Sequence, residues 1–224
     1  MLVNADFSRR AIVAPDQFVW VTSPQGGVER VMLDRVGGEK ARATSIVRYA
    51  PNSHFPHHQH PGGEEIFVLS GTFSENDRHY PAGWYLRSPP GSSHRPFTDD
   101  GAIIFVKLWQ MPAGEDRRIR IDSRSPDNWS GPCGRESCRL FASEHEQVRL
   151  QRFLPREAII SEEEGSVELL VLTGEVVLEG STYQRGTWMR LPAGDISDLA
   201  SGPSGATLYL KTGRFFNTSA EGWT

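Results

Sequence analysis

The feature that most constrains the fold is an internal repeat of glycines and prolines at an interval of 103 residues. The coinciding positions are Gly71 with Gly174, Gly83 with Gly186, Pro89 with Pro192 and Gly91 with Gly194. Glycine permits φ values that other residues avoid and proline fixes its own, so a shared register indicates one backbone path used twice. The 224 residues allow two domains of about 100 residues each. The repeat therefore predicts two copies of one domain.

Short runs of aliphatic, β-branched and aromatic residues lie between turn residues, and no run has the helical spacing of i, i+3, i+4 and i+7. The clearest runs are 18–22, 44–49, 66–73, 102–109, 147–153, 167–178 and 206–210. Most of the 22 glycines and 15 prolines fall between them. This pattern is typical of sandwiches and barrels. We therefore expect an all-β fold of two tandem β-barrels of jelly-roll type.

The repeat and the local composition also predict the domain boundaries. Residues 1–111 are expected to form the first barrel, to which the first 40 residues add edge strands. Residues 112–134 are expected to be a connector, because this stretch is rich in Arg, Asp, Ser, Gly and Pro. Residues 135–224 then form the second barrel.

Composition and charge exclude several functional classes. The chain has 38% apolar and 23% charged residues, which is a soluble globular balance. A net charge of -4 and scattered basic residues argue against direct nucleic-acid binding. We expect no membrane helix and no signal peptide. Two cysteines, Cys133 and Cys138, are too few for a disulfide framework, so we expect reduced thiols and a cytoplasmic protein.

A cluster of potential metal ligands lies in the first half of the chain. His58 and His60 are two residues apart, so in a strand both point to one face. Glu64 follows a Pro-Gly-Gly turn and begins the next apolar run, and His94 follows a Pro-Pro-Gly turn. Three imidazoles and one carboxylate suit Zn, Fe, Ni, Cu or Mn. We therefore predict one divalent metal ion bound by His58, His60, Glu64 and His94.

Other polar residues near this cluster have more ordinary interpretations. His54 and His57 are expected to lie on the loop that leads into the site. Glu65 has the opposite parity to Glu64 and is expected to form a salt bridge or to support a ligand. Arg87 either holds an anion in the pocket or is a solvated strand residue, and the sequence does not decide between these.

Two motifs together resemble those of the cupin superfamily. The first reads His-x-His-x3-Glu-x6-Gly from His58 to Gly71, and the second reads Gly-x5-Pro-x-Gly-x2-His from Gly83 to His94. Asn52 stands where the superfamily has a glycine, and Thr98 where it has an asparagine. Neither departure affects a ligand position. The resemblance implies a metal-binding cupin barrel in the first half and a weaker copy in the second.

Residues 60–71 and 80–94 resemble more closely the cupin domain of ChrR-type proteins. In that family the domain carries a metal, usually zinc, and follows a zinc-binding domain that inhibits an extracytoplasmic-function sigma factor until oxidative stress releases it. The His-x3-Cys-x2-Cys motif of that preceding domain is not found here. The resemblance therefore implies a metal-bearing sensor or regulatory module, with zinc as the expected metal and iron, nickel or manganese as alternatives. A sigma factor or regulatory protein would be reached through another chain.

Two other functions remain open at this stage. Cupins with three histidines and one glutamate include Fe- or Mn-dependent dioxygenases, so the first barrel could act on a small molecule such as a diketone or a phenol. In that case Glu64 would leave the metal or act as a base. A purely structural metal is the third alternative. A homodimer is compatible with the family, although no residue demonstrates it.

The second copy of the repeat is expected to bind no metal of this type. At the shift of 103 residues, the four ligand positions fall on Ser161, Glu163, Val167 and Ser197. None of these keeps the ligand type of the first copy. We therefore expect the second barrel to have a structural role.

Overall fold

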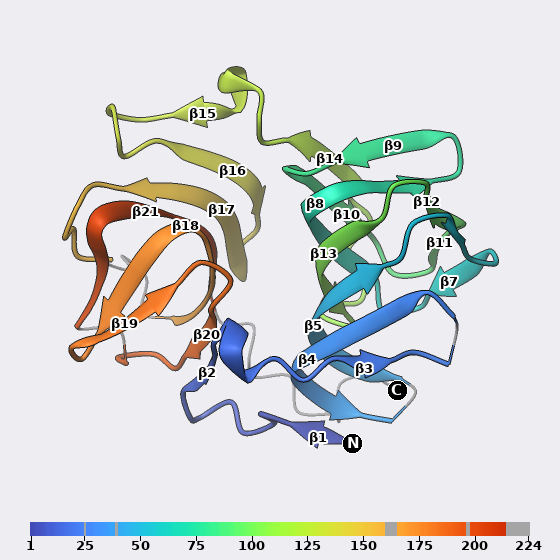
Figure 1. Cartoon of the computed structure of the whole chain (residues 1–224), viewed down its shortest axis with the longest axis horizontal. Helices are drawn as coiled ribbons and strands as arrows, with labels where there is room; N and C mark the ends of the chain where they lie inside the picture. Colours follow the sequence, from blue (N-terminus) through green and yellow to red (C-terminus); the bar gives the residue numbers. More distant parts are fainter. Residues whose placement is uncertain (25, 39, 160–164, 196–197, 214–224) are drawn as a thin grey trace. The chain divides into compact units, whose positions relative to one another are not determined.

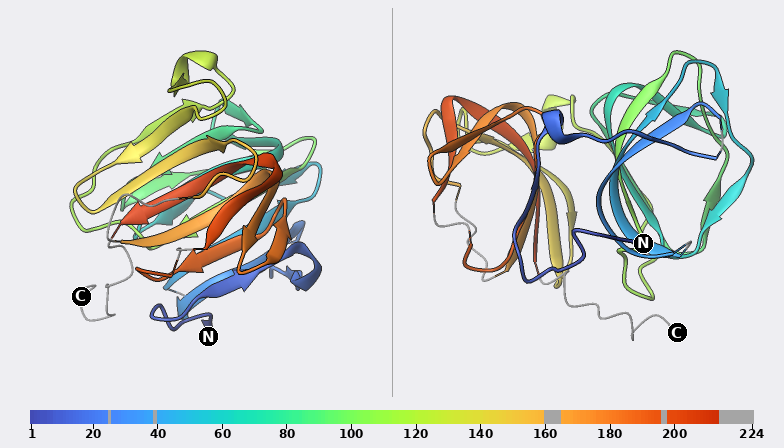
Figure 2. Two further views of the ribbon diagram at one scale, coloured as in Figure 1. Left: turned by 90° about the vertical axis from the view of Figure 1, so that its left-hand side faces the viewer. Right: turned by 60° about the horizontal axis from the view of Figure 1, so that its bottom comes forward.

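The protein is built almost entirely of β-strands, in two tandem barrels as the sequence predicts (Figure 1). A computed structural model describes residues 1–24, 26–38, 40–159, 165–195 and 198–213. These residues fall into two compact units. The strands of each unit curve around an interior of their own (Figure 2). No helix in the described part of the chain is long and apolar enough to cross a membrane.

Unit 1 comprises residues 1–5 and 19–126. Its strands are β1 (Leu2–Val3), β3 (Val21–Thr22), β4 (Val28–Gly37), β5 (Ala41–Tyr49), β6 (Ser53–His54), β7 (His58–His60), β8 (Glu64–Glu75), β9 (Arg78–Pro81), β10 (Trp84–Ser88), β11 (Ser92–His94), β12 (Pro96–Thr98), β13 (Ala102–Leu108) and β14 (Ile119–Asp122). The main sheet has the order β1-β4-β5-β13-β8-β10-β14, with further pairing by β3, β6, β9 and β12. Strands β7 and β11 form a separate two-stranded sheet.

Unit 2 comprises residues 6–18 and the described residues after 126. Its elements are β2 (Ala11–Val13), the 3-10 helix η1 (Pro15–Gln17), β15 (Trp129–Ser130), β16 (Ser137–Ala142), β17 (Glu146–Phe153), β18 (Ser166–Leu178), β19 (Ser181–Gln184), β20 (Trp188–Leu191) and β21 (Leu199–Gly213). A second 3-10 helix, η2 (Pro126–Asn128), lies where the two units meet along the chain. The sheet has the order β15-β16-β17-β21-β18-β20-β2, and β19 pairs with β18.

Strand register confirms that the two units repeat one backbone path. Tyr85 pairs with Phe67 in unit 1, and Trp188 pairs with Leu170 at the equivalent place in unit 2. The long strands β8 and β18 also share an irregularity at equivalent places, where one residue is skipped in the pairing with β13 or β21. Such a bulge reverses which face the following residues occupy. This reversal has consequences for the polar residues at the end of β8.

The division of the chain differs from the expected boundaries at two places. Residues 6–18 belong to unit 2, because β2 pairs with β20 and Arg10 binds Glu179 and Asp195 there. The expected connector, 112–134, is divided between the units after Pro126. Its alternating Ile-Arg-Ile-Asp segment is strand β14, which extends the sheet of unit 1 by pairing with β10.

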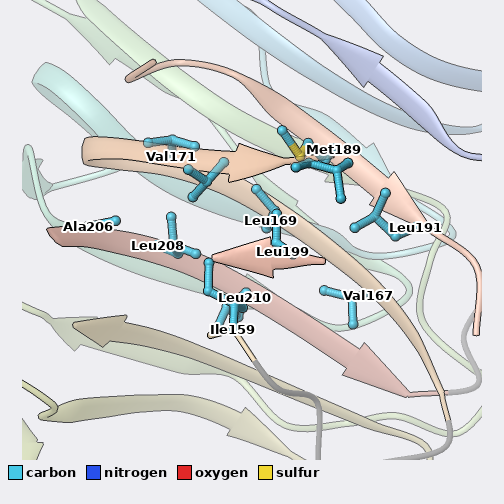
Figure 3. Packing of buried hydrophobic residues seen from close by; sticks show 12 residues of the cluster. Ile159, Val167, Leu169, Val171, Met189, Leu191, Leu199, Ala206, Leu208 and Leu210 are labelled. Carbon is cyan, nitrogen blue, oxygen red and sulfur yellow. The ribbon is translucent and has the colours of Figure 1, made fainter. Parts of the chain in front are cut away.

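Each unit has an apolar core in its interior. In unit 1 the core includes Ile66, Val68, Leu86 and Ile104. Unit 2 is filled by a larger set, shown in Figure 3: Ile159, Val167, Leu169, Val171, Val176, Leu178, Met189, Leu191, Leu199, Ala206, Leu208 and Leu210. All twelve are less than a tenth exposed. The interior of the second barrel is therefore packed with aliphatic side chains.

We predict that Gly71→Ala destabilises unit 1 much more than Gly114→Ala. Both glycines have positive φ, at +69° and +89°. A Cβ at Gly71 would clash with the carbonyl oxygen of Gly101, whereas a Cβ at Gly114 would meet nothing within 4 Å. Positive φ alone costs about 1–2 kcal/mol, and the clash should add at least about 2 kcal/mol. Urea unfolding of both variants measures the difference, and equal losses would contradict this account.

Candidate metal centre

Three histidines converge because β7 and β11 pair in a fixed register. His58 lies directly opposite His94 in this antiparallel pair, and His60 follows His58 by two residues. All three side chains therefore project from one face of the small sheet. Their ring centroids are 4.8–4.9 Å apart, with interplanar angles of 67–84°. One nitrogen from each ring lies within 4.8 Å of the other two.

Glu64 reaches the same point from the start of β8. Its Oε2 atom lies 3.5 Å from Nε2 of His60 and 3.6 Å from Nε2 of His94. Gly63 has a φ of +75°, and its N–H donates to the carbonyl oxygen of His60 in the turn that connects β7 to β8. The turn thus places a carboxylate beside the imidazoles. Glu64 therefore lies beside two of the three histidines, His60 and His94.

The spacing of these donors fits a single transition-metal ion. Metal–nitrogen and metal–oxygen bonds of about 2.0–2.2 Å place neighbouring donors about 3.0–3.4 Å apart. Nε2 of His60 lies 2.9 Å from Nε2 of His94, and both lie 3.5–3.6 Å from the Glu64 carboxylate. Imidazole and carboxylate donors suit several divalent metals, so the set fits a metal without identifying it.

Hydrogen bonds leave the Nε2 atoms directed at this point. Nδ1 of His58 lies 3.0 Å from the carbonyl oxygen of Pro56, to which it donates. Nδ1 of His94 lies 2.7 Å from Oε2 of Glu75. A histidine whose Nδ1 donates a hydrogen bond keeps Nε2 available for a metal. The local contacts therefore prepare two of the three rings for coordination.

Burial shifts the pKa values of His60, Glu64 and His94. It lowers the pKa of His60 to about 3, aided by the neighbouring histidines, so this ring is neutral at physiological pH. Burial also raises the pKa of Glu64 to about 7. Burial lowers the pKa of His94, but the bond to Glu75 and the nearby carboxylates outweigh it, and the net shift is upward. A cation would therefore displace protons from Glu64 and His94.

The sequence did not indicate Glu75 or Arg120, which support the site. Glu75 ends β8 and is eleven residues from Glu64, an odd interval that would place the two on opposite faces of a regular strand. The bulge at Leu69 reverses that alternation. Arg120 belongs to the stretch expected to be a connector, and it binds Glu75 with Nη2 2.6 Å from Oε1.

Other polar residues near the motif do not enter the cluster. Glu65 forms the salt bridge that the sequence suggested, with Nη1 of Arg87 2.8 Å from its Oε2. Arg87 is fully buried and paired with Glu65, so it is not the solvated strand residue that the sequence allowed. His54 stacks on Phe97, with ring centroids 5.7 Å apart. His57 is exposed on the loop before β7.

The second unit has an apolar residue in place of Glu64. Val167, at the position of Glu64, lies in the aliphatic core shown in Figure 3. The other three equivalent residues, Ser161, Glu163 and Ser197, lie outside the described residues. Cys133 and Cys138 are free, one exposed and one buried, and burial raises the pKa of Cys138 to about 11.

Comparison with known proteins identifies the superfamily. A family model described as the ChrR cupin-like domain matches residues 8–112. Residues 8–112 therefore contain a cupin-like domain. No curated protein matches this chain significantly in sequence.

Solved structures show the same fold at low sequence identity. A candidate dioxygenase from Nostoc punctiforme has a TM-score of 0.69 and 16% identity, covering 98% of this chain and 84% of that chain. Protein YlbA from E. coli has a TM-score of 0.67 and 15% identity, covering 96% and 94%. The bacterial pirin YhhW from E. coli, solved with nickel(II), has a TM-score of 0.66 and 15% identity, covering 92% and 99%.

We predict that His58→Ala and His94→Ala each abolish stoichiometric metal binding, whereas His57→Ala does not. Each of the first two removes a converging imidazole, while His57 lies on the preceding loop. The affinity loss should exceed the about 10–100-fold that removal of a supporting hydrogen bond costs. Elemental analysis after dialysis against a weak chelator measures the metal content. Full occupancy in the His94 variant would refute the ligand assignment.

We also predict that metal affinity falls as the pH is lowered through about 7. Below this pH, Glu64 holds a proton that the metal must displace, because its pKa is raised to about 7. Competition titrations with a chelator between about pH 8 and pH 5.5 measure the trend. Glu64→Gln should bind more weakly and with a shallower pH dependence. A metal affinity that does not change with pH across this range would contradict the role of Glu64.

Proposed function

We propose that the first barrel binds one divalent transition metal through His58, His60, Glu64 and His94, and that this metal-loaded barrel is a sensory or regulatory module. The convergence of three imidazoles and one carboxylate from two different sheets supports the proposal. The match to the ChrR cupin-like domain supports a regulatory role for this barrel. Zinc is the proposed metal, and nickel in the pirin YhhW is a reason to test nickel, iron and manganese as well.

The arrangement of sheets suggests how metal loading could be sensed. Strands β7 and β11 carry the histidines but form a sheet separate from the main sheet, to which Glu64 on β8 belongs. A metal bound by all four ligands would tie the two sheets together. Loss of the metal, or oxidation of a ligand, would release the small sheet from Glu64. The released surface would be the signal read by a protein partner, such as a sigma-factor regulator on another chain.

A metal-dependent dioxygenase is the second candidate function. His58 is exposed while His94 is buried, so one side of the cluster faces solvent and a small molecule could approach the metal there. In that case Glu64 would accept a proton from the substrate, and the metal would supply the redox chemistry. The candidate dioxygenase from Nostoc punctiforme shares the fold, which makes this alternative worth a direct test.

We predict that metal removal selectively exposes β7 and β11 to hydrogen exchange. The metal-loaded protein should protect the amides of 58–60 and 92–94, and the metal-free protein should lose this protection while β13 keeps its own. Mass spectrometry of loaded, metal-free and peroxide-treated protein measures the effect. Peroxide treatment should resemble metal removal. Unchanged protection in all three samples would overturn the sensory proposal.

Oxygen uptake separates the two candidate functions. The iron- and manganese-loaded protein is incubated with a β-diketone or a phenol, with His94→Ala as the inactive control. Uptake that depends on both metal and substrate, and that vanishes in the control, would favour the dioxygenase. Absence of uptake together with a metal-dependent change in exchange would favour the sensor.

A further inference from the structure

The carboxylate of Glu75 connects a predicted metal ligand to a strand outside the motif region. Its Oε2 lies 2.7 Å from Nδ1 of His94. Its Oε1 accepts hydrogen bonds from Arg120, at 2.6 Å from Nη2 and 3.1 Å from Nε, and from the hydroxyl of Tyr80 at 3.3 Å. Both oxygens are therefore engaged, one toward the metal centre and one toward β14.

Arg120 is held in place by several groups of β10 and β14. Its Nη1 donates to the carbonyl oxygens of Arg87 and Ile119 at 2.9 and 2.8 Å, and its Nη2 donates to Oγ of Ser88 at 2.9 Å. The guanidinium lies on a side chain that is only 12% exposed. A planar guanidinium with this many fixed acceptors orients a carboxylate in a single direction.

We propose that Glu75 and Arg120 are positioning residues that couple the docking of β14 to metal affinity at His94. This inference rests on the proposed metal centre. Glu75 orients the imidazole of His94 so that Nε2 faces the metal, and Arg120 orients Glu75. Strand β14 carries Arg120. The pairing of this strand with β10 and the orientation of the His94 imidazole therefore depend on each other.

Because β14 lies at the edge of the sheet, its undocking could regulate metal affinity. The strand is four residues long, lies at the edge of the main sheet and, among the described residues, pairs with β10 alone. Short edge strands open at lower free-energy cost than central strands. Undocking of β14 would remove Arg120 and leave the buried Glu75 carboxylate without its cation. Thermodynamic coupling is reciprocal. If docking of β14 raises metal affinity, metal binding must stabilise the docked strand by the same free energy.

The second barrel provides an internal comparison. Leu178 occupies the position of Glu75 there, just as Val167 occupies the position of Glu64. Both are buried in the aliphatic core of unit 2, where Figure 3 labels Val167. The copy that lacks the Glu64 carboxylate thus also lacks the Glu75 carboxylate. This joint loss is expected if Glu75 serves the metal centre rather than the barrel fold.

The test measures Zn²⁺ affinity by chelator competition in wild type and in four variants, one of which is a control. Glu75→Gln and Arg120→Met should bind Zn²⁺ about 10–100-fold more weakly than wild type, and Arg120→Lys should recover part of the loss. Arg124→Met is the matched control, because Arg124 follows β14 closely and pairs with Asp122 at 2.7 Å, with half of its side chain exposed. This control should stay within about twofold of wild type.

Hydrogen exchange supplies a second and independent readout. Zn²⁺ should slow exchange of the amides of 119–122 in wild type, and this effect should be lost in Glu75→Gln. Unaltered Zn²⁺ affinity in both Glu75→Gln and Arg120→Met, or equal protection of β14 in wild type and Glu75→Gln, would overturn the coupling. Wild type that binds no metal would overturn the proposed function itself. Circular dichroism and the retained binding of Arg120→Lys distinguish a folded variant from an unfolded one.

Discussion

The cross-strand pair of His58 and His94 determines the geometry of the whole candidate site. Because these residues are directly opposite in β7 and β11, their imidazoles meet without any long-range adjustment, and His60 joins them through strand alternation. The main sheet adds one donor from β8 and one supporting carboxylate from the far end of the same strand. In the site, the two carboxylates of β8 thus connect the main sheet to the small sheet that carries the histidines.

Electrostatics explains why such a cluster favours a cation over solvent or protons. Two carboxylates and three imidazoles are brought together, and the guanidinium of Arg120 balances the charge of Glu75. Burial raises the pKa of Glu64 to about 7 because a buried carboxylate charge loses its hydration, which is costly, and the charge of nearby Glu75 adds to this effect. A divalent ion removes that cost by replacing protons with a stronger positive charge. In the second barrel, Val167 and Leu178 stand at the positions of the two carboxylates and belong to the aliphatic core.

The sequence predicted the features that depend on local spacing. The repeat of glycines and prolines predicted two barrels, and the motif spacing with its flanking turns indicated the three clustered histidines and the nearby Glu64. It did not predict Glu75, because the bulge at Leu69 alters strand parity and a bulge has no clear signature in one sequence. It also did not assign Arg120 to a strand, because residues 112–134, rich in Arg, Asp, Ser, Gly and Pro, have the composition of a connector. Long-range pairing, which determines the partners of β2 and β14, is not encoded in local pattern.

The pairing of β2 with β20 has a consequence for how the chain is made. Ala11–Val13 is synthesised well before its partner Trp188–Leu191, and the salt bridge from Arg10 to Asp195 spans 185 residues. Unit 2 can be completed only after β20 has been synthesised, and β20 follows all of unit 1 along the chain. The first barrel can therefore fold while the second still lacks a strand. The order of synthesis thus separates the completion of the two barrels in time.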